Sequence, residues 1–332
     1  MKIFITGSTG FLGSYLVPLL IENGHQIRCW VRKSSNTDQL KKADVEIITG
    51  KLSDRTALVD AMQDMDAVIH MANVYSFWEP EPSIYEEVNI NGTINVLLSA
   101  MDVDIKKFLL ISTAVIYGNT NEQPFNENTQ PGTERFSHYA ESKYYGELFA
   151  RKFSKERNLP LVVIQPASII GPGDVKTSGA YVASIIQKKL PAIGFKQSKI
   201  SFVHANDVAA GIVSALEKED NIGETYIIGH NAITLDHYMK KISEYSGVSL
   251  PSLVLPDWLI MMIAQALTVM STRSNKPPLW GMSLDQARTF RNGFQCDGSK
   301  AERELGIQYT PIDTAIKETV EWWMQKNNFP KT

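Results

Sequence analysis

The sequence contains few cysteines, and its positive and negative charges nearly balance. The 332 residues include two cysteines, Cys29 and Cys296, too few for a disulfide framework or, by themselves, for a metal-ligand cluster. We therefore expect no metal, and a reducing compartment, the cytoplasm. The 33 basic and 36 acidic residues are mixed along the chain and give a net charge of -3. The chain therefore lacks a polybasic footprint for nucleic acid or anionic lipid, and we expect no nucleic-acid partner.

Long apolar runs are also missing. The chain starts Met-Lys-Ile-Phe-Ile-Thr-Gly, without the longer apolar stretch and cleavage site of a secretory signal. The most apolar later stretch, residues 259–270, contains Gln265 and is shorter than the roughly 20 residues that span a bilayer. We expect no membrane span, and we predict that this stretch forms a buried helix near a substrate pocket.

Short β-type runs and longer helical segments alternate through the first half of the chain. The predicted strands are residues 2–6, 26–31, 45–48, 67–70, 108–112 and 161–165. The predicted helices between them include residues 11–22, 83–101 and 137–156. This alternation predicts an α/β fold with a doubly wound parallel sheet, helices on both faces and right-handed connections.

Three glycines, Gly7, Gly10 and Gly13, lie between the first strand and the first helix. Glycine at such a turn lets the backbone approach a pyrophosphate, and the helix N-terminus adds free N–H groups. The spacing is G-x-x-G-x-x-G, not the usual G-x-G-x-x-G, and glycine also serves tight turns for steric reasons alone. We interpret the segment as the cofactor loop of a Rossmann fold, with contacts from Gly7, Thr9, Gly10, Phe11, Leu12 and Gly13.

Beyond about residue 170 the alternation loosens, starting at Gly171-Pro172-Gly173. No Gly/Ser linker, repeat or low-complexity tract separates the two parts. We predict a dinucleotide-binding core at residues 1–170. Residues 171–332 are predicted to form mainly a smaller C-terminal substrate-binding lobe, with some segments returning to the core.

The residues after the second predicted strand bear on which dinucleotide binds. NAD sites usually place an acid about 20 residues beyond the glycines to hold the ribose 2′-hydroxyl. Here Arg32 and Lys33 occupy that corner, and the next acid is Asp38. A guanidinium and an ammonium suit a 2′-phosphate, so we predict NADP(H) in preference to NAD(H). The alternative is that both side chains belong to a solvated loop.

Tyr139 and Lys143 stand four residues apart in the third predicted helix and so share a face. A free tyrosine, with a pKa of about 10, is a poor base at neutral pH. A cation about 4 Å away can lower that pKa by about three units at an effective dielectric near 20, so we expect Lys143 to activate Tyr139. Ser112 and Thr113 follow a strand at the sheet edge where a substrate oxygen would lie. The alternative is an exposed tyrosine with a surface lysine.

These motifs together resemble the extended short-chain dehydrogenase/reductase superfamily, also called the epimerase/dehydratase family. The similar segments are residues 6–13, 70–72, 88–95, 112–118, 139–143, 166–174, 202–207 and 297–306. The resemblance implies that Tyr139 transfers the proton, Lys143 also binds the nicotinamide ribose, and Thr113 assists, with Ser112 as the next candidate. It further implies cofactor contacts at Leu52, Met71, Ala72, Asn89, Pro166, Ser168 and Ile169.

Departures from the family pattern narrow the choice of branch. Sugar-nucleotide dehydratases of the family carry an Asp-Glu pair that drives water elimination. This chain has Ala114 and Val115 at those two positions. Ile200 stands where nucleotide-sugar enzymes commonly carry a diphosphate-binding arginine, and Lys51 replaces the acid of an adenine-side Gly-Asp-Leu pattern. The chain looks most like the dihydroflavonol-reductase-like branch, which includes proteins labelled hopanoid-associated sugar epimerases.

We therefore predict an NADP-dependent enzyme that interconverts a ketone and a secondary alcohol on an apolar or aromatic small molecule. Tyr75, Phe77, Trp78 and Ser112 are candidate substrate contacts, although each aromatic ring is also typical of a core. A sugar epimerase with a retained cofactor and a non-catalytic dinucleotide-sensing regulator remain alternatives. The resemblance implies a homodimer formed by helices 83–101 and 137–156.

Three further sets of residues carry structural expectations. His70 and His204, each at a strand end, are predicted to be hydrogen-bonded core histidines. Asp207 is predicted to cap a helix over residues 207–217. The Trp322-Trp323 pair is predicted to pack one ring inward from the last helix.

Overall fold

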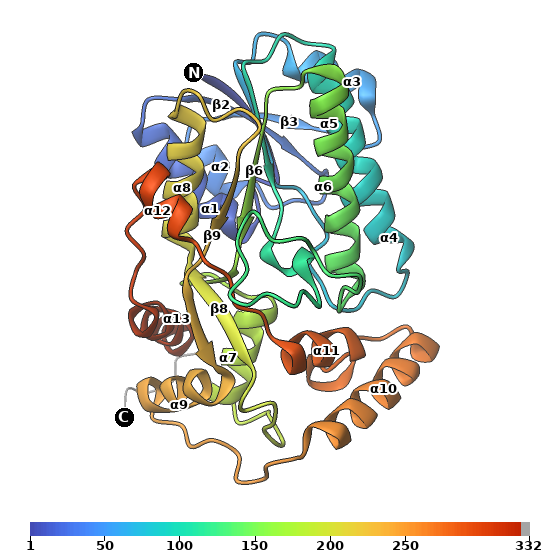
Figure 1. Ribbon diagram of the computed structural model, residues 1–332, viewed down its shortest axis with the longest axis vertical. Coiled ribbons are helices and arrows are strands. Elements are labelled where there is room, and N and C mark those ends of the chain that lie inside the picture. Colours follow the sequence, from blue (N-terminus) through green and yellow to red (C-terminus); the bar gives the residue numbers. More distant parts are fainter. Residues whose placement is uncertain (327–332) are drawn as a thin grey trace.

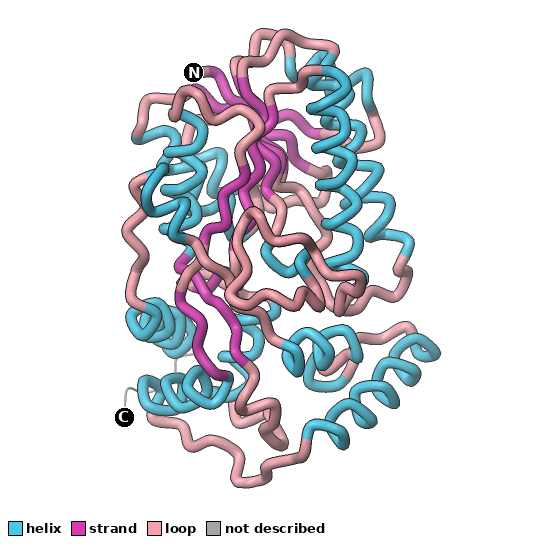
Figure 2. The backbone as a smooth tube through the Cα atoms, viewed as in Figure 1, coloured by secondary structure: helices cyan, strands magenta, loops and turns pink. Residues whose placement is uncertain are grey.

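The computed structural model describes residues 1–326 and is built on a seven-stranded parallel sheet (Figures 1 and 2). The strand order is β3-β2-β1-β4-β5-β6-β9. β1 lies inside the sheet, where Thr6 pairs with Trp30 of β2 and with His70 of β4. The chain therefore reverses direction across the sheet beside β1, which is where ligands bind in folds of this kind. The strands are β1 Lys2–Thr6, β2 Gln26–Val31, β3 Glu46–Thr49, β4 Ala67–His70, β5 Lys107–Ile111, β6 Leu161–Pro166 and β9 Thr225–Ile228.

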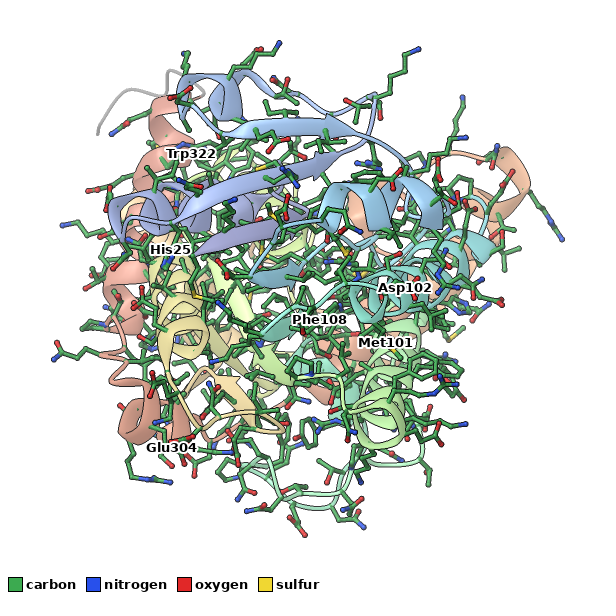
Figure 3. The ribbon with its side chains drawn as sticks, turned by 90° about the horizontal axis from the view of Figure 1, so that it is seen from above. His25, Met101, Asp102, Phe108, Glu304 and Trp322 are labelled. Carbon is green, nitrogen blue, oxygen red and sulfur yellow. The ribbon has the colours of Figure 1, made fainter. Side chains whose placement is uncertain are left out.

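Helices cover both faces of the sheet, as predicted. α1 (Phe11–Glu22) and α8 (Ala205–Glu217) pack together on one face, and α3 (Arg55–Met62), α5 (Thr93–Met101) and α6 (His138–Arg157) cover the other (Figure 1). Successive side chains of a strand point to opposite faces of the sheet, so each strand contributes to two hydrophobic cores, one on each face. Ile3 and Ile5 pack under α1, whereas Phe4 packs on the opposite side with Phe108, which lies deep in the molecule in Figure 3. α2 (Asp38–Lys42) and α12 (Ser299–Leu305) complete this part.

The rest of the chain builds a second lobe below the carboxyl edge of the sheet in Figure 1. Its three-stranded sheet has the order β10-β8-β7, with β7 Ser168–Ile170, β8 Lys199–His204 and β10 Asn231–Thr234. Around it lie α7 Thr177–Ile186, α9 Leu235–Ser246, α10 Asp257–Ser274, α11 Leu284–Asn292 and α13 Ile312–Lys326. α8, β9 and α12 return to the larger sheet. Residues 327–332 of the predicted lobe lie outside the described part of the chain.

The expected elements differ from the structure in detail. The strands expected at residues 45–48 and 108–112 are each displaced by one residue, because pairing with a neighbouring strand, not local propensity, sets the register. The helix expected over residues 83–101 exists as α4 (Ser83–Tyr85) and α5, joined by the π-helical segment η1 (Glu86–Gly92). One extra residue per turn there re-aims the side chains that follow.

Two structural expectations are wrong. The apolar stretch 259–270 belongs to the longer helix α10, but it is not buried, since Met262 and Met270 are each 61% exposed. Asp207 does not cap its helix: α8 begins two residues earlier, and the His204 ring accepts from the Asn206 N–H. The Asp207 carboxylate instead accepts hydrogen bonds from the backbone N–H and hydroxyl of Thr310.

The expectations for His70, His204 and the Trp322-Trp323 pair are confirmed. His70 is buried between the hydroxyls of Thr6 and Thr93, and His204 is buried beneath the Glu318 carboxylate. Trp323 packs into the core. Within residues 1–326, no helix combines the length and the apolar character needed to cross a bilayer.

Candidate active site

The glycine loop passes tightly between β1, β4 and the start of α1. Gly7 has a φ of 81°, and a Cβ atom there would come within 2.7 Å of the Ala72 backbone nitrogen. A Cβ atom on Gly13 would lie 2.3 Å from the Ser8 carbonyl oxygen. Side chains are therefore excluded at both positions, which satisfies the steric explanation of these glycines. Helix α1 starts at Gly10 without a side-chain cap, so its first N–H groups face the carboxyl edge of the sheet.

The wall beside this loop is held by a buried hydrogen-bond network. The Thr93 hydroxyl donates to the Asn89 carbonyl, so its oxygen accepts from His70 Nε2 at 3.0 Å, and His70 Nδ1 accepts from Thr6 at 2.7 Å. Burial, and then the positive charge of Lys143, lower the pKa of His70 to about 3 and keep it neutral. The Thr6 hydroxyl also accepts from the Ala72 N–H, which fixes the segment after β4.

Asn89, in η1, ties the segment after β4 to helix α6. Its amide oxygen accepts from the Val74 N–H at 2.7 Å, and its amide nitrogen donates to the Ser142 hydroxyl at 2.9 Å. Leu52 packs against the core that contains Phe4 and Phe108, and Met71 is buried beside β1. A cofactor role for each of these residues stays a prediction.

Arg32 and Lys33 follow the carboxyl end of β2, one strand away from the glycine loop. Both side chains are exposed, and neither makes an ion pair within residues 1–326. Asp38 lies beyond them in α2, where its backbone N–H binds the Asn36 side chain. The loop after β2 therefore exposes two cations that form no ion pair within residues 1–326.

Tyr139 and Lys143 lie in the first turns of α6 and both are buried, with 7% and 4% of their surfaces exposed. The Ser137 hydroxyl caps the helix by accepting from the Ala140 N–H at 3.1 Å. The Lys143 ammonium donates to the carbonyl of Ile111, the last residue of β5, at 2.7 Å. The alternative of an exposed tyrosine beside a surface lysine is thereby wrong.

The expected activation of Tyr139 by Lys143 is not what the structure shows. Burial, and then the neighbouring Tyr75, raise the pKa of Tyr139 above its ordinary value, while a hydrogen bond with Thr113 acts in the opposite direction. Lys143 is not among the groups that shift this pKa; its ammonium donates to the Ile111 carbonyl, and burial lowers its own pKa to about 8. The phenol is therefore held in its protonated form.

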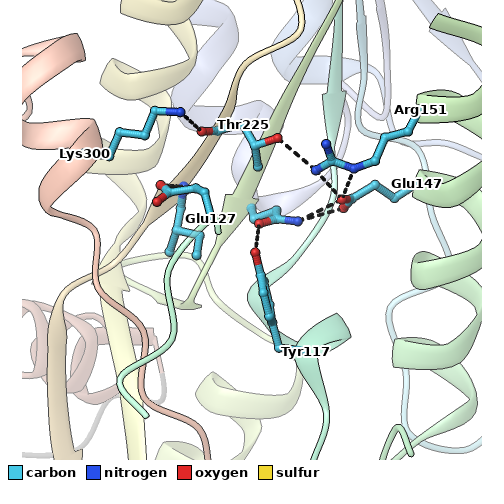
Figure 4. Close-up of polar contacts among 8 residues, drawn as sticks. Tyr117, Glu127, Glu147, Arg151, Thr225 and Lys300 are labelled. Carbon is cyan, nitrogen blue, oxygen red and sulfur yellow. Dashed lines mark hydrogen bonds and ion pairs between the residues drawn. The ribbon is translucent and has the colours of Figure 1, made fainter. Parts of the chain in front are cut away.

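A buried polar network anchors the middle of α6 to the sheet (Figure 4). The Glu147 carboxylate, one turn beyond Lys143, accepts from Gln165 at 2.9 Å and from Arg151 at 2.7 Å. Arg151 also donates to the Thr225 hydroxyl of β9 at 2.8 Å, and Tyr117 donates to Gln165 at 3.2 Å. Glu147 also raises the pKa of Lys143, partly offsetting its burial. Sequence analysis missed this network because its members lie up to 108 positions apart.

Two hydroxyls and a turn lie at the ends of β5 and β6, and one hydroxyl, that of Thr113, interacts with Tyr139. Thr113 accepts from the Val115 N–H at 3.4 Å, and the buried Ser112 hydroxyl has no hydrogen-bond partner within residues 1–326. Pro166 ends β6, and Ser168 and Ile169 open β7, so the backbone turns there from one sheet to the other. An unpaired buried hydroxyl costs free energy unless a ligand satisfies it.

Aromatic rings surround the phenol of Tyr139. The Tyr75 ring lies edge-on to it at a centroid distance of 5.0 Å, and Phe77 lies at 6.4 Å. Trp78 is half-buried, and its carbonyl accepts from Ser76, which orders the same loop. The two rings nearest Tyr139 thus make its surroundings apolar.

The second lobe contacts the first turn of α6 and the Phe77 loop through residues that no sequence motif indicated. The Asp285 carboxylate of α11 accepts from the His138 N–H, in the first turn of α6, at 2.8 Å. The Ser283 hydroxyl donates to the Phe77 carbonyl at 2.8 Å. These partners lie 147 and 206 residues apart, so no local pattern predicts them.

Comparisons with known proteins agree with this geometry. The model of the NAD dependent epimerase/dehydratase family matches residues 3–229. The chain is 29% identical to a putative dihydroflavonol 4-reductase of Synechocystis, covering 99% of this chain and 96% of that protein. It is 26% identical to sterol demethylase protein B of Methylococcus capsulatus, covering 98% and 99%. The crystal structure of gox2253 superposes with a TM-score of 0.84 at 27% identity over 99% of both chains. The chain belongs to the NAD-dependent epimerase/dehydratase family and is an NAD(P)-dependent enzyme of the extended short-chain dehydrogenase/reductase type.

Proposed function

We propose that this enzyme is an NADP-dependent reductase or dehydrogenase that interconverts a ketone and a secondary alcohol on an apolar or aromatic small molecule. One observation carries the proposal: a buried, protonated Tyr139 phenol lies among aromatic rings, with Lys143 one helical turn away. The name of the Synechocystis relative, a reductase, supports the same reaction class.

The residues around the glycine loop fit a dinucleotide. The uncapped start of α1 offers N–H groups to a pyrophosphate, and the excluded Cβ atoms of Gly7 and Gly13 leave the backbone free to approach it. Thr9, Gly10, Phe11 and Leu12 would complete that cradle. Leu52, Met71, Ala72 and Asn89 would line the adenosine and ribose side, and Pro166, Ser168 and Ile169 the nicotinamide side. A bound nicotinamide cofactor would supply or accept the hydride.

Tyr139 would move the proton at the substrate oxygen. In the reductive direction the phenol enters the reaction with its proton in place and can donate it as the substrate oxygen gains negative charge. Thr113, already within hydrogen-bond reach of Tyr139, would orient the same oxygen. The Ser112 hydroxyl is free to donate to that oxygen, and Lys143 would hold a cofactor ribose and oppose negative charge on the phenol.

NADP(H) is favoured over NAD(H) because of the charge at the end of β2. Arg32 and Lys33 are exposed cations without ion pairs in the described chain, and an arginine can grip a 2′-phosphate through two parallel hydrogen bonds. Some solved structures of similar fold are named as complexes with NAD, among them a UDP-glucuronic acid 4-epimerase of Bacillus cereus at 21% identity. At that identity the likeness concerns the fold alone.

The substrate class follows from Tyr75 and Phe77, which make the space beside Tyr139 aromatic, with Trp78 on the same loop. Ile200, buried in β8, offers no charge for a diphosphate, which weighs against a nucleotide sugar. The alternative reading, an epimerase that retains its cofactor, is supported by 25% identity to the UDP-glucose 4-epimerase of Vibrio cholerae.

Steady-state turnover distinguishes the reductase from the epimerase. We expect the enzyme to consume NADPH continuously with flavanonols, steroid ketones or other apolar ketones, followed as loss of nicotinamide absorbance. Conversion of a sugar nucleotide without net NADPH consumption would establish the epimerase instead. A Tyr139→Phe variant that keeps the cellular role would point to the third reading, a dinucleotide-sensing regulator.

A homodimer and a cytoplasmic location complete the proposal. Helix α6 exposes Tyr145, Leu148 and Phe149 at 40%, 47% and 36% on the face turned away from the sheet, which supports a two-fold interface between α6 helices. Light scattering should give twice the chain mass of 37.1 kDa. A Leu148→Glu variant should give the monomer mass.

A further inference from the structure

Helix α10 is apolar on two opposite faces, and its own fold covers only one of them. Ile260, Ala264 and Leu267 are buried against the second lobe. The opposite side presents Trp258 and Met262, 62% and 61% exposed. A helix that is apolar all round is normally buried on all sides. We name the exposed side the α10 face and define it as Trp258, Met262, Val269 and Met270 together with Leu279 and Trp280 of the following turn.

The turn after α10 extends this face and contains a residue with an unfavourable backbone conformation. η3 (Leu279–Gly281) holds Trp280 at a φ of 56°, a conformation that bulky side chains avoid. The turn is closed by hydrogen bonds from Gly281 to Pro278 and from Met282 to Leu279. Leu279 and Trp280 are 58% and 51% exposed. The backbone conformation costs free energy, and in this structure it accompanies an indole that remains half exposed.

The two charged residues between Asp257, the exposed first residue of α10, and Asp285 are both basic. They are Arg273 and Lys276. Both are exposed, and neither makes an ion pair in the described part of the chain. Arg273 lies fifteen residues after Trp258 and eleven after Met262, spacings that place it on the same side of the helix. An apolar stripe with basic residues and tryptophans is the pattern of a helix that lies in a membrane interface.

The α10 face also adjoins the candidate active site. An open groove of about 450 Å³ is lined by Met261, Met262, Gln265, Ala266 and Leu284. Leu284 is next to Ser283, which donates to the Phe77 carbonyl, and the Phe77 ring lies 6.4 Å from that of Tyr139. The groove is therefore linked to the rings around the phenol through Leu284, Ser283 and Phe77.

We propose that the α10 face seats the enzyme on an anionic lipid membrane, with Trp258 and Trp280 in the interface and Arg273 and Lys276 against lipid headgroups. The charge pattern favours this occupant: an anionic surface complements both cations, and residues 258–284 contain no carboxylate that it would repel. Indole rings are enriched where one end is apolar and the other is wet. The surface does not depend on a polybasic segment, which the sequence lacks. Nor does it depend on the proposed reaction, since lipid binding is measured without substrate.

The test is sedimentation of the full chain with vesicles of phosphatidylcholine alone or mixed with phosphatidylglycerol. We expect binding to the mixed vesicles that weakens with added salt. Each neutralised cation should weaken it about fivefold, so Arg273→Gln with Lys276→Gln should lose about 25-fold. Met262→Glu with Met270→Glu should abolish binding. Ile222→Glu, at a 48% exposed apolar residue outside the α10 face, is the matched control and should bind like the unaltered chain.

A second measurement locates the contact. Lipids with brominated acyl chains should quench tryptophan fluorescence, and Trp258→Phe with Trp280→Phe should remove most of the quenching while vesicle binding remains. The proposal is overturned if the chain binds neither vesicle, or if the Met262/Met270 and Ile222 variants bind alike. It is also overturned if the Met262/Met270 variant splits an oligomer while no vesicle binds, because the face then joins two copies of the chain.

Discussion

The parallel-sheet half of the molecule hides ionisable groups, whereas helix α10 of the second lobe exposes apolar ones. Lys143 and Glu147 are 4% and 5% exposed, while Trp258 and Met262 are 62% and 61% exposed. Both arrangements reverse the usual distribution, in which charges lie outside and large apolar side chains inside. Each reversal coincides with a surface to which we assign a function. In our proposals the buried charges serve chemistry and the exposed apolar residues serve contact, so stability and activity should respond differently to changes in the two regions.

The largest effect is expected at the buried phenol. Tyr139→Phe removes the transferable proton but keeps the ring packing, so kcat for ketone reduction should fall about a thousandfold. The melting temperature should change little, which thermal unfolding checks on the same sample. Retention of more than a tenth of the activity would show that the proton comes from another group.

Replacing the buried lysine should stabilise the fold while it inactivates the enzyme. Burial lowers the pKa of Lys143 from 10.5 to about 8, so the folded chain binds fewer protons than the unfolded chain between these two pH values. The cost of the buried charge is therefore complete below pH 8 and disappears as the pH approaches 10.5.

Lys143→Met should accordingly raise the free energy of unfolding by up to about 3 kcal/mol at pH 7, with the gain vanishing near pH 10.5. Denaturant titrations at several pH values measure this difference. A variant that is less stable than the unaltered chain at pH 7 would mean that the hydrogen bond to Ile111 outweighs the cost of burial.

A smaller effect is expected from an exposed charge at the edge of the sheet. Arg32→Ala should lower the preference for NADP over NAD, as the ratio of kcat/KM values, by about tenfold, since one charge-assisted contact of about 1.4 kcal/mol is lost. Stability should be unchanged because Arg32 makes no ion pair within residues 1–326. An unaltered ratio would show that Arg32 belongs to a solvated loop.

The smallest effect on folding is expected at the exposed apolar residues. Met262→Gln should alter the free energy of unfolding by no more than about 0.5 kcal/mol, because little of its surface is buried on folding. Urea titration measures this change. A loss above about 2 kcal/mol would show that Met262 packs within the fold in solution.

The same contrast explains what the sequence could predict. Residues such as Thr6, Ser112 and Tyr139 follow strands or open helices, and parallel strands bring their carboxyl ends to one edge, so their proximity follows from chain order. The exposure of α10 was mispredicted because composition alone does not show which faces of an apolar helix are covered. The pKa of Tyr139 was mispredicted because it depends on the burial of the phenol and on the neighbouring Tyr75, which the spacing of Tyr139 and Lys143 does not show. Contacts such as Asp285 with His138 depend on how the second lobe docks.

The hydrogen bond from the His138 N–H to Asp285 has a consequence for biosynthesis. The helix that carries Tyr139 and Lys143 is translated long before its acceptor in α11, which lies 147 residues later in the chain. A nascent or truncated polypeptide ending before residue 285 would hold the whole reactive pair, yet the opening turn of that helix would lack this partner. Under the proposed function, the helix that carries the reactive pair therefore gains this partner only after residue 285 has emerged and α11 has docked.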